Sequence, residues 1–114
     1  MEQKAITVLV VEDSPTDALL LREALRDERS LKIQTAHAET LSEALRCLQE
    51  RRFDLILLDL GLPDSQGLET FARMHDHAPQ VPIIVLTGLD DDELAIQAVK
   101  EGAQDFLTKG RVDR

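Results

Sequence analysis

The chain has 114 residues and a formal net charge of −9, a balance that argues against a nucleic-acid-binding surface. Its length is that of one domain with a single core, and no apolar run approaches the roughly 20 residues of a membrane span. Cys47 is the only cysteine, which excludes an internal disulfide and fits a reducing compartment. We therefore expect a cytoplasmic domain that binds neither nucleic acid nor a membrane.

The first half of the chain predicts two strands and two helices. Residues 6–11 are apolar except for Thr7 and mostly β-branched, as in a strand buried on both faces. A helix is expected from Pro15, because Ser14 can cap its free N–H groups and proline suits the first position. Residues 31–35 alternate between apolar and polar side chains, which is typical of an edge strand. Thr40 then begins a capping box and a helix with an apolar stripe.

The second half continues the alternation of strands and helices. Residues 55–58 form an unbroken apolar run, which predicts a strand buried on both faces that ends at Asp59. The remaining expected elements are a helix over 68–77, a strand over 81–86, a helix over 90–101 and a strand over 103–107. Gly102 is expected to stop the last of these helices.

Five strands that alternate with four helices predict a doubly wound α/β fold. We expect a parallel five-stranded sheet of flavodoxin-like order 2-1-3-4-5, with helices on both faces. A fifth helix would normally follow the last strand, but only residues 111–114 remain. We therefore expect the final helix to be absent or truncated, and residues 1–114 to be the N-terminal part of a longer protein.

Polar side chains follow four of the predicted strands: Glu12 and Asp13, Asp59, Thr87, and Lys109. They should converge, because the carboxyl ends of parallel strands share one edge of the sheet. Carboxylates about 5 Å apart at an effective dielectric of about 20 repel by on the order of 3 kcal/mol per pair. A hard divalent cation removes this cost, and a few oxygen ligands completed by waters favour Mg²⁺. Together with the ammonium and the hydroxyl, the metal makes a site for a phosphoryl group carried on Asp59.

The ordered motifs resemble the receiver domain of two-component response regulators over nearly the whole chain. They are Glu12-Asp13, Asp59 followed by Gly61 and Pro63, Thr87-Gly88, and Phe106 three residues before Lys109. The resemblance implies that Asp59 is the phosphoacceptor. It also implies that Asp13, Asp59 and the backbone carbonyl of Gly61 bind Mg²⁺, while Glu12 reaches the metal through water.

The resemblance further implies a conformational switch. Thr87 and Lys109 are expected to hold the phosphoryl group, and Phe106 to turn inward as Thr87 moves. Family members receive the group from a histidine of a sensor kinase or phosphotransfer protein, or from small donors such as acetyl phosphate. They pass the signal to a partner or to a C-terminal output domain. Such a domain promotes only its own phosphorylation and dephosphorylation, so we do not expect an enzyme.

Two other functions compete with this one. A Mg²⁺-dependent phosphohydrolase would use Asp59 as its nucleophile, but many such enzymes carry an acid two residues later, where this chain has Gly61. A docking scaffold that is never phosphorylated would not need the intact set of site residues.

Neither Gly61 nor Leu89 can orient a water, so we expect slow to moderate self-dephosphorylation. Gly110 replaces the family's usual proline, which favours a trans bond after Lys109.

Overall fold

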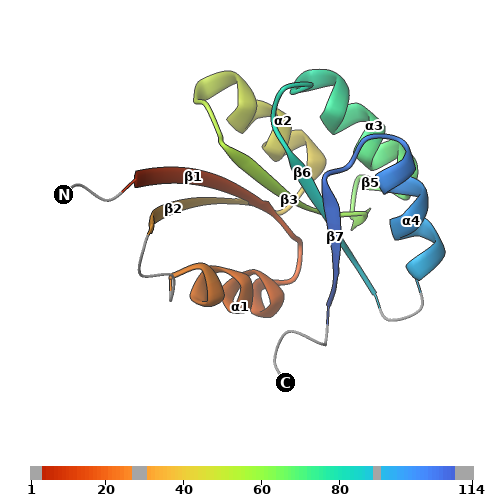
Figure 1. Ribbon diagram of the computed structural model, residues 1–114, viewed down its shortest axis with the longest axis horizontal. Helices are drawn as coiled ribbons and strands as arrows, with labels where there is room; N and C mark the ends of the chain where they lie inside the picture. Colours follow the sequence, from red (N-terminus) through yellow and green to blue (C-terminus); the bar gives the residue numbers. More distant parts are fainter. Residues whose placement is uncertain (1–3, 27–30, 89–90, 110–114) are drawn as a thin grey trace.

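The structure is a computed structural model that describes residues 4–26, 31–88 and 91–109. Within these ranges the chain alternates between strands and helices (Figure 1). In order, the elements are β1 (Lys4–Val11), α1 (Pro15–Arg26), β2 (Leu31–Ala38), α2 (Leu41–Glu50), β3 (Leu55–Asp59), β4 (Gly61–Leu62), β5 (Ser65–Gln66), α3 (Leu68–His77), β6 (Ile83–Thr87), α4 (Asp92–Lys100) and β7 (Asp105–Thr108). The expectation that the final helix is absent or truncated concerns residues that lie outside the described ranges.

Five of the strands form one sheet in the order β2-β1-β3-β6-β7, and every neighbouring pair is parallel. This is the predicted order 2-1-3-4-5, so the doubly wound α/β fold is confirmed. Figure 1 shows α1 on one face of the sheet and α2, α3 and α4 on the other. The carboxyl ends of β1, β3, β6 and β7 therefore meet at one edge, as the parallel arrangement requires.

The sheet separates two hydrophobic clusters, and alternation along β1 shows why. Val8 and Val10 pack toward α1 together with Ala18 and Leu21, whereas the neighbouring Leu9 and Val11 face the opposite side. The larger cluster lies on that opposite side and includes Leu41 of α2, Phe71 and Met74 of α3, and Ala98 of α4. Both faces of the central strands are covered, which fits the nearly continuous apolar runs within β1, β3 and β6.

Both predicted helix caps are present. The Ser14 hydroxyl accepts a hydrogen bond from the N–H of Asp17 at 3.3 Å, and the Thr40 hydroxyl accepts one from the N–H of Glu43 at 3.1 Å. The reciprocal bond of the expected capping box is shifted by one residue. The Glu43 carboxylate accepts from the N–H of Glu39 at 3.1 Å rather than from that of Thr40.

Several predicted strand limits were wrong by a few residues. β2 continues to Ala38 because it pairs with β1 along its whole length, ending at Val11↔Ala38. β6 begins at Ile83 because Pro82 has no N–H to donate. β7 begins at Asp105 because the N–H of Ala103 still bonds to the α4 carbonyl of Ala98 at 2.9 Å. Gly102, with φ of +126°, follows the end of α4 as expected.

The loop after β3 contains a short hairpin that was not predicted. β4 and β5 form an antiparallel ladder of two residue pairs between Asp59 and α3. Asp64, at its tip, accepts hydrogen bonds from the N–H groups of Leu41 at 2.8 Å and Ser42 at 3.0 Å. These bonds lower the pKa of Asp64, the bond from Leu41 most of all. The hairpin thus ties the loop after Asp59 to the start of α2.

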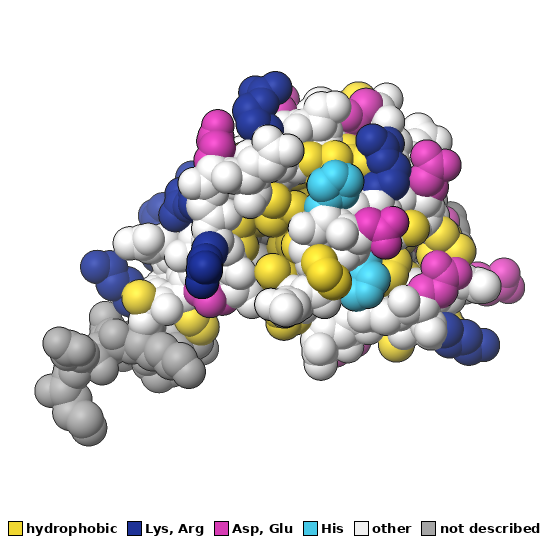
Figure 2. All heavy atoms as spheres, turned by 90° about the horizontal axis from the view of Figure 1, so that it is seen from above, with side chains coloured by type: hydrophobic (Ala, Val, Ile, Leu, Met, Phe, Trp, Pro, Cys, Tyr) yellow, Lys and Arg dark blue, Asp and Glu magenta, His cyan; other side chains and the backbone are white. Residues whose placement is uncertain are grey.

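The opposite edge of the sheet carries a different surface. The C-terminal ends of α2 and α3 lie at the top of Figure 1, and Figure 2 views this side from above, with hydrophobic surface among charged and histidine side chains. A groove of about 550 Å³ lies here between the chain segments that precede β3 and β6, and Arg51 and Arg52 are among its lining residues. Arg51 stacks over the ring of Phe53 at 5.3 Å. Within the described ranges, no helix is long and apolar enough to cross a membrane.

Candidate functional site

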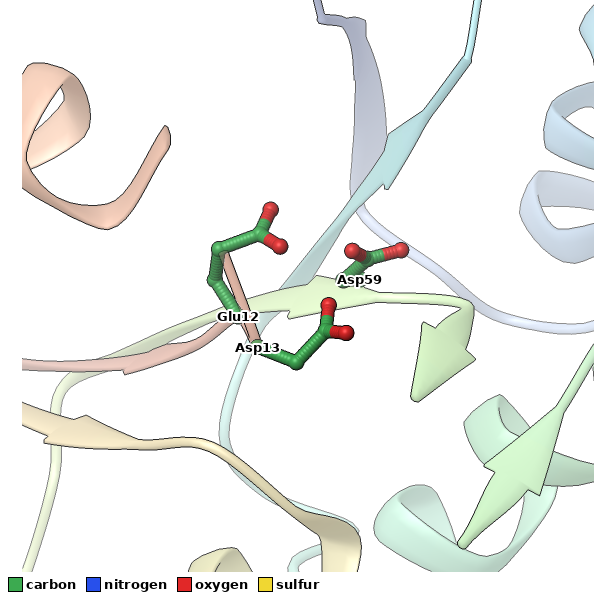
Figure 3. Close-up of side chains that lie close together, drawn as sticks. All are labelled: Glu12, Asp13 and Asp59. Carbon is green, nitrogen blue, oxygen red and sulfur yellow. The ribbon is translucent and has the colours of Figure 1, made fainter. Parts of the chain in front are cut away.

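Three carboxylates meet at the carboxyl edge of the sheet. Glu12 and Asp13 directly follow β1, Asp59 is the last residue of β3, and one oxygen of each lies within 4.8 Å of the others. Figure 3 shows the three side chains converging from these two strand ends. Glu12 is fully buried and Asp59 is 6% exposed, whereas Asp13 is exposed. The sequence predicted this convergence from the parallel order of the strands alone.

Lys109, which follows β7, reaches into this carboxylate cluster. Its ammonium donates hydrogen bonds to Asp59 Oδ2 at 2.9 Å and to Glu12 Oε1 at 3.0 Å. A third carboxylate, Asp17 Oδ2 in the first turn of α1, lies 3.5 Å away. The backbone N–H of Lys109 donates to the carbonyl of Thr87 at 2.7 Å, which fixes the start of the side chain at the sheet edge.

The ionisable groups of the cluster perturb one another. The pKa of Glu12 is raised to about 7, first by burial and then by the neighbouring Asp59 carboxyl, although the Ser14 N–H and Lys109 oppose the shift. Burial alone would lower the pKa of Lys109. Its hydrogen bonds to Asp59 and Glu12 outweigh this effect and raise the pKa above its ordinary value. The ammonium therefore stays charged across the physiological range.

Backbone N–H groups occupy the remaining carboxylate oxygens of the two buried acids. Asp59 Oδ1 accepts from the N–H of Gly61 at 2.8 Å, and Glu12 Oε2 accepts from the N–H of Ser14 at 3.0 Å. Both oxygens of Glu12 are thus engaged directly by protein donors. Asp13 is the exposed member of the cluster and the one that faces solvent. An all-oxygen set of this kind suits a hard divalent cation.

A cleft of about 440 Å³ opens above the three carboxylates. Its wall includes Thr87 and Gly88 from the end of β6, and Asp91 before α4. The Thr87 hydroxyl is buried and has no hydrogen-bond partner among the described residues. A buried unpaired hydroxyl is costly, so this oxygen is suited to bind a polar group that enters the cleft.

Phe106 lies apart from the cleft. It pairs with Val85 in the β6–β7 ladder, is half-buried, and packs against the larger hydrophobic cluster. Its neighbour Leu107 is 42% exposed. In the β6–β7 ladder, the pair formed by Val85 and Phe106 lies two positions before the pair formed by Thr87 and Thr108.

Two acids near the site were not predicted to belong to it. The sequence indicates only that Asp17 is a favourable charge in the first turn of a helix. Its contact with Lys109 depends on how α1 packs against the sheet. Asp91 lines the cleft, and its Oδ2 lies 3.5 Å from where a Cβ on Gly88 would be. The expectations for Leu89 and for the bond between Lys109 and Gly110 involve residues outside the described ranges.

Comparison with known proteins identifies the family. Residues 8–113 match the response regulator receiver domain. The chain is 39% identical over 101 residues to the response regulator protein PilR of Pseudomonas aeruginosa, covering 89% of this chain and 22% of PilR. It is 40% identical over 102 residues to the KDP operon transcriptional regulatory protein KdpE of Escherichia coli, covering 90% of this chain and 44% of KdpE. The chain thus spans less than half the length of these relatives.

Solved structures agree with the sequence matches. NtrX from Brucella abortus superposes with a TM-score of 0.83 at 29% identity, over 96% of this chain and 25% of that one. The Mn²⁺-bound form of response regulator Rcp1 superposes with a TM-score of 0.80 at 29% identity, over 93% of this chain and 82% of that one. The family match, the fold and the acidic strand-end cluster lead to one conclusion: the chain belongs to the receiver domains of two-component response regulators.

Proposed function

We propose that this domain is a phosphorylation switch in which Asp59 accepts the phosphoryl group. A carboxylate oxygen of Asp59 attacks phosphorus, a P–O bond forms, and the bond from phosphorus to the donor breaks. The donor leaves as a neutral histidine side chain or as acetate, and Asp59 becomes an acyl phosphate. The observation that carries this proposal is the position of Asp59, buried at the base of the cleft with an ammonium 2.9 Å away and two further carboxylates within 4.8 Å.

The proposed metal ligands are Asp13, Asp59 and the backbone carbonyl of Gly61, with Glu12 acting through a water. A bound Mg²⁺ would offset the repulsion among the carboxylates and the charge of the phosphoryl oxygens. The Mn²⁺-bound form of Rcp1 shows that a similar receiver takes a divalent cation, which supports the same class of ion here.

Thr87 and Lys109 are the proposed phosphoryl-binding side chains. The Lys109 ammonium is already at the acceptor, and the unpaired Thr87 hydroxyl can donate a hydrogen bond to a phosphoryl oxygen once it turns toward the cleft. We propose that this movement of Thr87 is transmitted to Phe106 through the adjacent strands β6 and β7. The ring of Phe106 then turns inward, and the surface around β7 changes.

We further propose that residues 1–114 are the N-terminal part of a longer cytoplasmic protein. The phosphodonor would be a sensor histidine kinase or a phosphotransfer protein, and the signal would pass to a C-terminal output domain or a separate target. The small fraction of PilR and KdpE that this chain covers supports such an organisation. The domain acts on itself only and is not proposed to turn over a substrate.

A phosphohydrolase is less well supported. The position two residues after Asp59 is Gly61, which has no side chain to donate a proton to a leaving group. The same lack of a side chain favours slow to moderate loss of the phosphoryl group from Asp59, because no group at this position can orient a water. A phosphoryl lifetime of seconds in Mg²⁺ buffer would contradict the slow loss.

The test is the intact mass of the protein after incubation with acetyl phosphate and Mg²⁺. We expect the wild-type protein to gain one phosphoryl group, and expect no gain for Asp59→Asn or for wild type in excess chelator. Asp76→Asn, which removes an exposed acid of α3, is the matched control and should behave like wild type. Addition to Asp59→Asn at the wild-type rate would overturn the assignment of the acceptor.

A further inference from the structure

The Lys109 ammonium has three N–H donors, and three carboxylates of the described chain surround it. Two of them, Asp59 and Glu12, belong to the buried cluster and lie 2.9 and 3.0 Å away. The third is Asp17, whose Oδ2 lies 3.5 Å away and whose side chain is 38% exposed. Asp17 comes from the first turn of α1, so this contact joins that helix to the residue that follows β7.

We propose that Asp17 is a positioning residue that holds the Lys109 ammonium in the unphosphorylated arrangement and thereby slows phosphoryl transfer to Asp59. This inference rests on the proposed function, since it concerns the rate of that reaction. It assigns to Asp17 a role that neither the metal-binding acids nor the acceptor has. Asp17 contacts the cation of the site without belonging to the three-carboxylate cluster.

Two effects give the proposal its direction. An incoming phosphoryl group needs a free N–H of Lys109, and Asp17 competes with it for the ammonium. Asp17 also carries a negative charge close to the cleft, which repels an anionic donor. Both effects raise the barrier to transfer, so removal of the charge should accelerate the reaction. A partly exposed ion pair changes an equilibrium or a rate by a few-fold, so we expect about a threefold effect.

The local geometry shows that the contact is built into the helix start. Glu12 Oε2 accepts from the N–H of Ser14 at 3.0 Å, and the Ser14 hydroxyl accepts from the N–H of Asp17 at 3.3 Å. The carboxyl group of Asp17 takes no part in this series of hydrogen bonds and extends to Lys109. A purely structural role at the start of α1 would instead appear as a loss of stability with an unchanged rate of phosphorylation.

The experiment is the initial rate of phosphoryl addition from acetyl phosphate in Mg²⁺, followed by intact mass for wild type and four variants. Asp17→Asn removes the charge and keeps the shape, while Asp17→Glu tests rescue by a conservative change. Glu69→Gln removes an exposed acid from the first turn of α3, away from the cleft lining, as a matched control. Asp91→Asn removes a cleft acid that forms no ion pair with Lys109 among the described residues.

We expect Asp17→Asn to react about threefold faster than wild type, Asp17→Glu to return close to the wild-type rate, and Glu69→Gln to leave it unchanged. Asp91→Asn should accelerate less than Asp17→Asn, because it relieves repulsion alone. The Asp17→Asn effect should persist at about 0.1 M salt, since a contact at 3.5 Å is much shorter than the screening length of about 10 Å at that ionic strength.

Three outcomes would overturn the proposal. An equal or slower rate for Asp17→Asn would show that the contact does not restrain Lys109. Equal acceleration in Asp91→Asn would show that repulsion accounts for the whole effect. A lower melting temperature of Asp17→Asn without a change in rate would assign Asp17 to the stability of α1. Failure of wild type to gain any phosphoryl group would instead overturn the proposed function itself, and this inference with it.

Discussion

Strand β3 passes from the apolar interior of the sheet to its charged edge within a few residues. Ile56 and Leu58 are fully buried among hydrocarbon side chains, and Asp59 is only 6% exposed. The first two are stabilised by removal from water, which is favourable at every pH and in any buffer. Asp59 instead lies beside another buried acid and one ammonium, so its free energy depends on these neighbouring charges and on bound ions.

This difference separates the apolar interior, which maintains the fold, from the charged edge of the sheet, which responds to bound ions. The interior is close-packed and has one arrangement. The edge has more negative than positive charge, so binding of a cation there is electrostatically favourable and stabilises the folded protein. Substitutions in the two regions should therefore differ in sign and in their dependence on conditions.

The largest expected effect comes from the interior. Ile56→Ala should lower the free energy of unfolding by about 4 kcal/mol, because it removes buried methyl groups and leaves a cavity. Urea unfolding with and without Mg²⁺ measures this loss. The difference between variant and wild type should be the same in both buffers. A loss that Mg²⁺ reverses would mean that the interior and the edge are not separate in the way described.

The second effect concerns pH at the edge. The pKa of Glu12 is about 7 in the folded protein against an ordinary value of 4.5. The folded state therefore holds this proton more tightly than the unfolded state. The stability from this source is complete below about pH 4.5 and is lost as the pH rises to 7, by about 3 kcal/mol at most. Urea unfolding in chelator across this range measures it.

Glu12→Gln is the matched variant, because the neutral amide cannot ionise. It should show little of the loss between pH 5 and 7 that wild type shows in chelator, and Mg²⁺ should reduce the loss in wild type. Equal stability of the wild-type protein in chelator at pH 5 and at pH 7 would contradict the raised pKa of Glu12.

A third effect has the opposite sign to the interior substitution. Without metal, Asp13→Asn should raise the free energy of unfolding by about 1 kcal/mol, because it removes a negative charge from the cluster of three carboxylates. With Mg²⁺ the order should reverse, since the variant lacks a proposed ligand. Thermal unfolding in the two buffers tests this, with Asp76→Asn as the control for loss of an exposed acid elsewhere. A destabilised Asp13→Asn in chelator would count against repulsion at the edge.

The smallest effect tests the link between the loop after Asp59 and α2. Asp64→Ala removes an acceptor for two N–H groups at the start of α2 and should cost about 0.5 kcal/mol, since the group is exposed. The pKa of Asp64 is lowered from 3.8, so its contribution is present above that pH and is lost as the pH falls below it. Wild type and variant should converge in stability in acid, and a constant difference down to pH 2 would contradict this.

Much of this organisation follows from the sequence because its causes are local. The apolar runs at 55–58 and 6–11 have no alternation, which indicates strands covered on both faces. Parallel order then brings their carboxyl ends to one edge, and this places Glu12 and Asp59 together without any knowledge of distances. Helix caps such as Ser14 and Thr40 can likewise be predicted from the sequence, because a single side chain determines each cap.

What the sequence did not predict depends on contacts between distant segments. The β4–β5 hairpin is two residue pairs long, too short to have a pattern of its own. Aspartate is a residue typical of turns, and only the packing of the loop against α2 gives Asp64 its hydrogen-bond partners. The contact between Asp17 and Lys109 joins residues at opposite ends of the chain, so no spacing rule could have indicated it.

The most direct test of the central claim is to locate the phosphoryl group chemically. After reaction with acetyl phosphate and Mg²⁺, borohydride reduces an aspartyl phosphate to homoserine, which peptide mass spectrometry can assign to one position. The account predicts homoserine at position 59 only, and none when the metal is removed. Homoserine at position 13, an unmodified chain, or modification that does not need a divalent cation would contradict it.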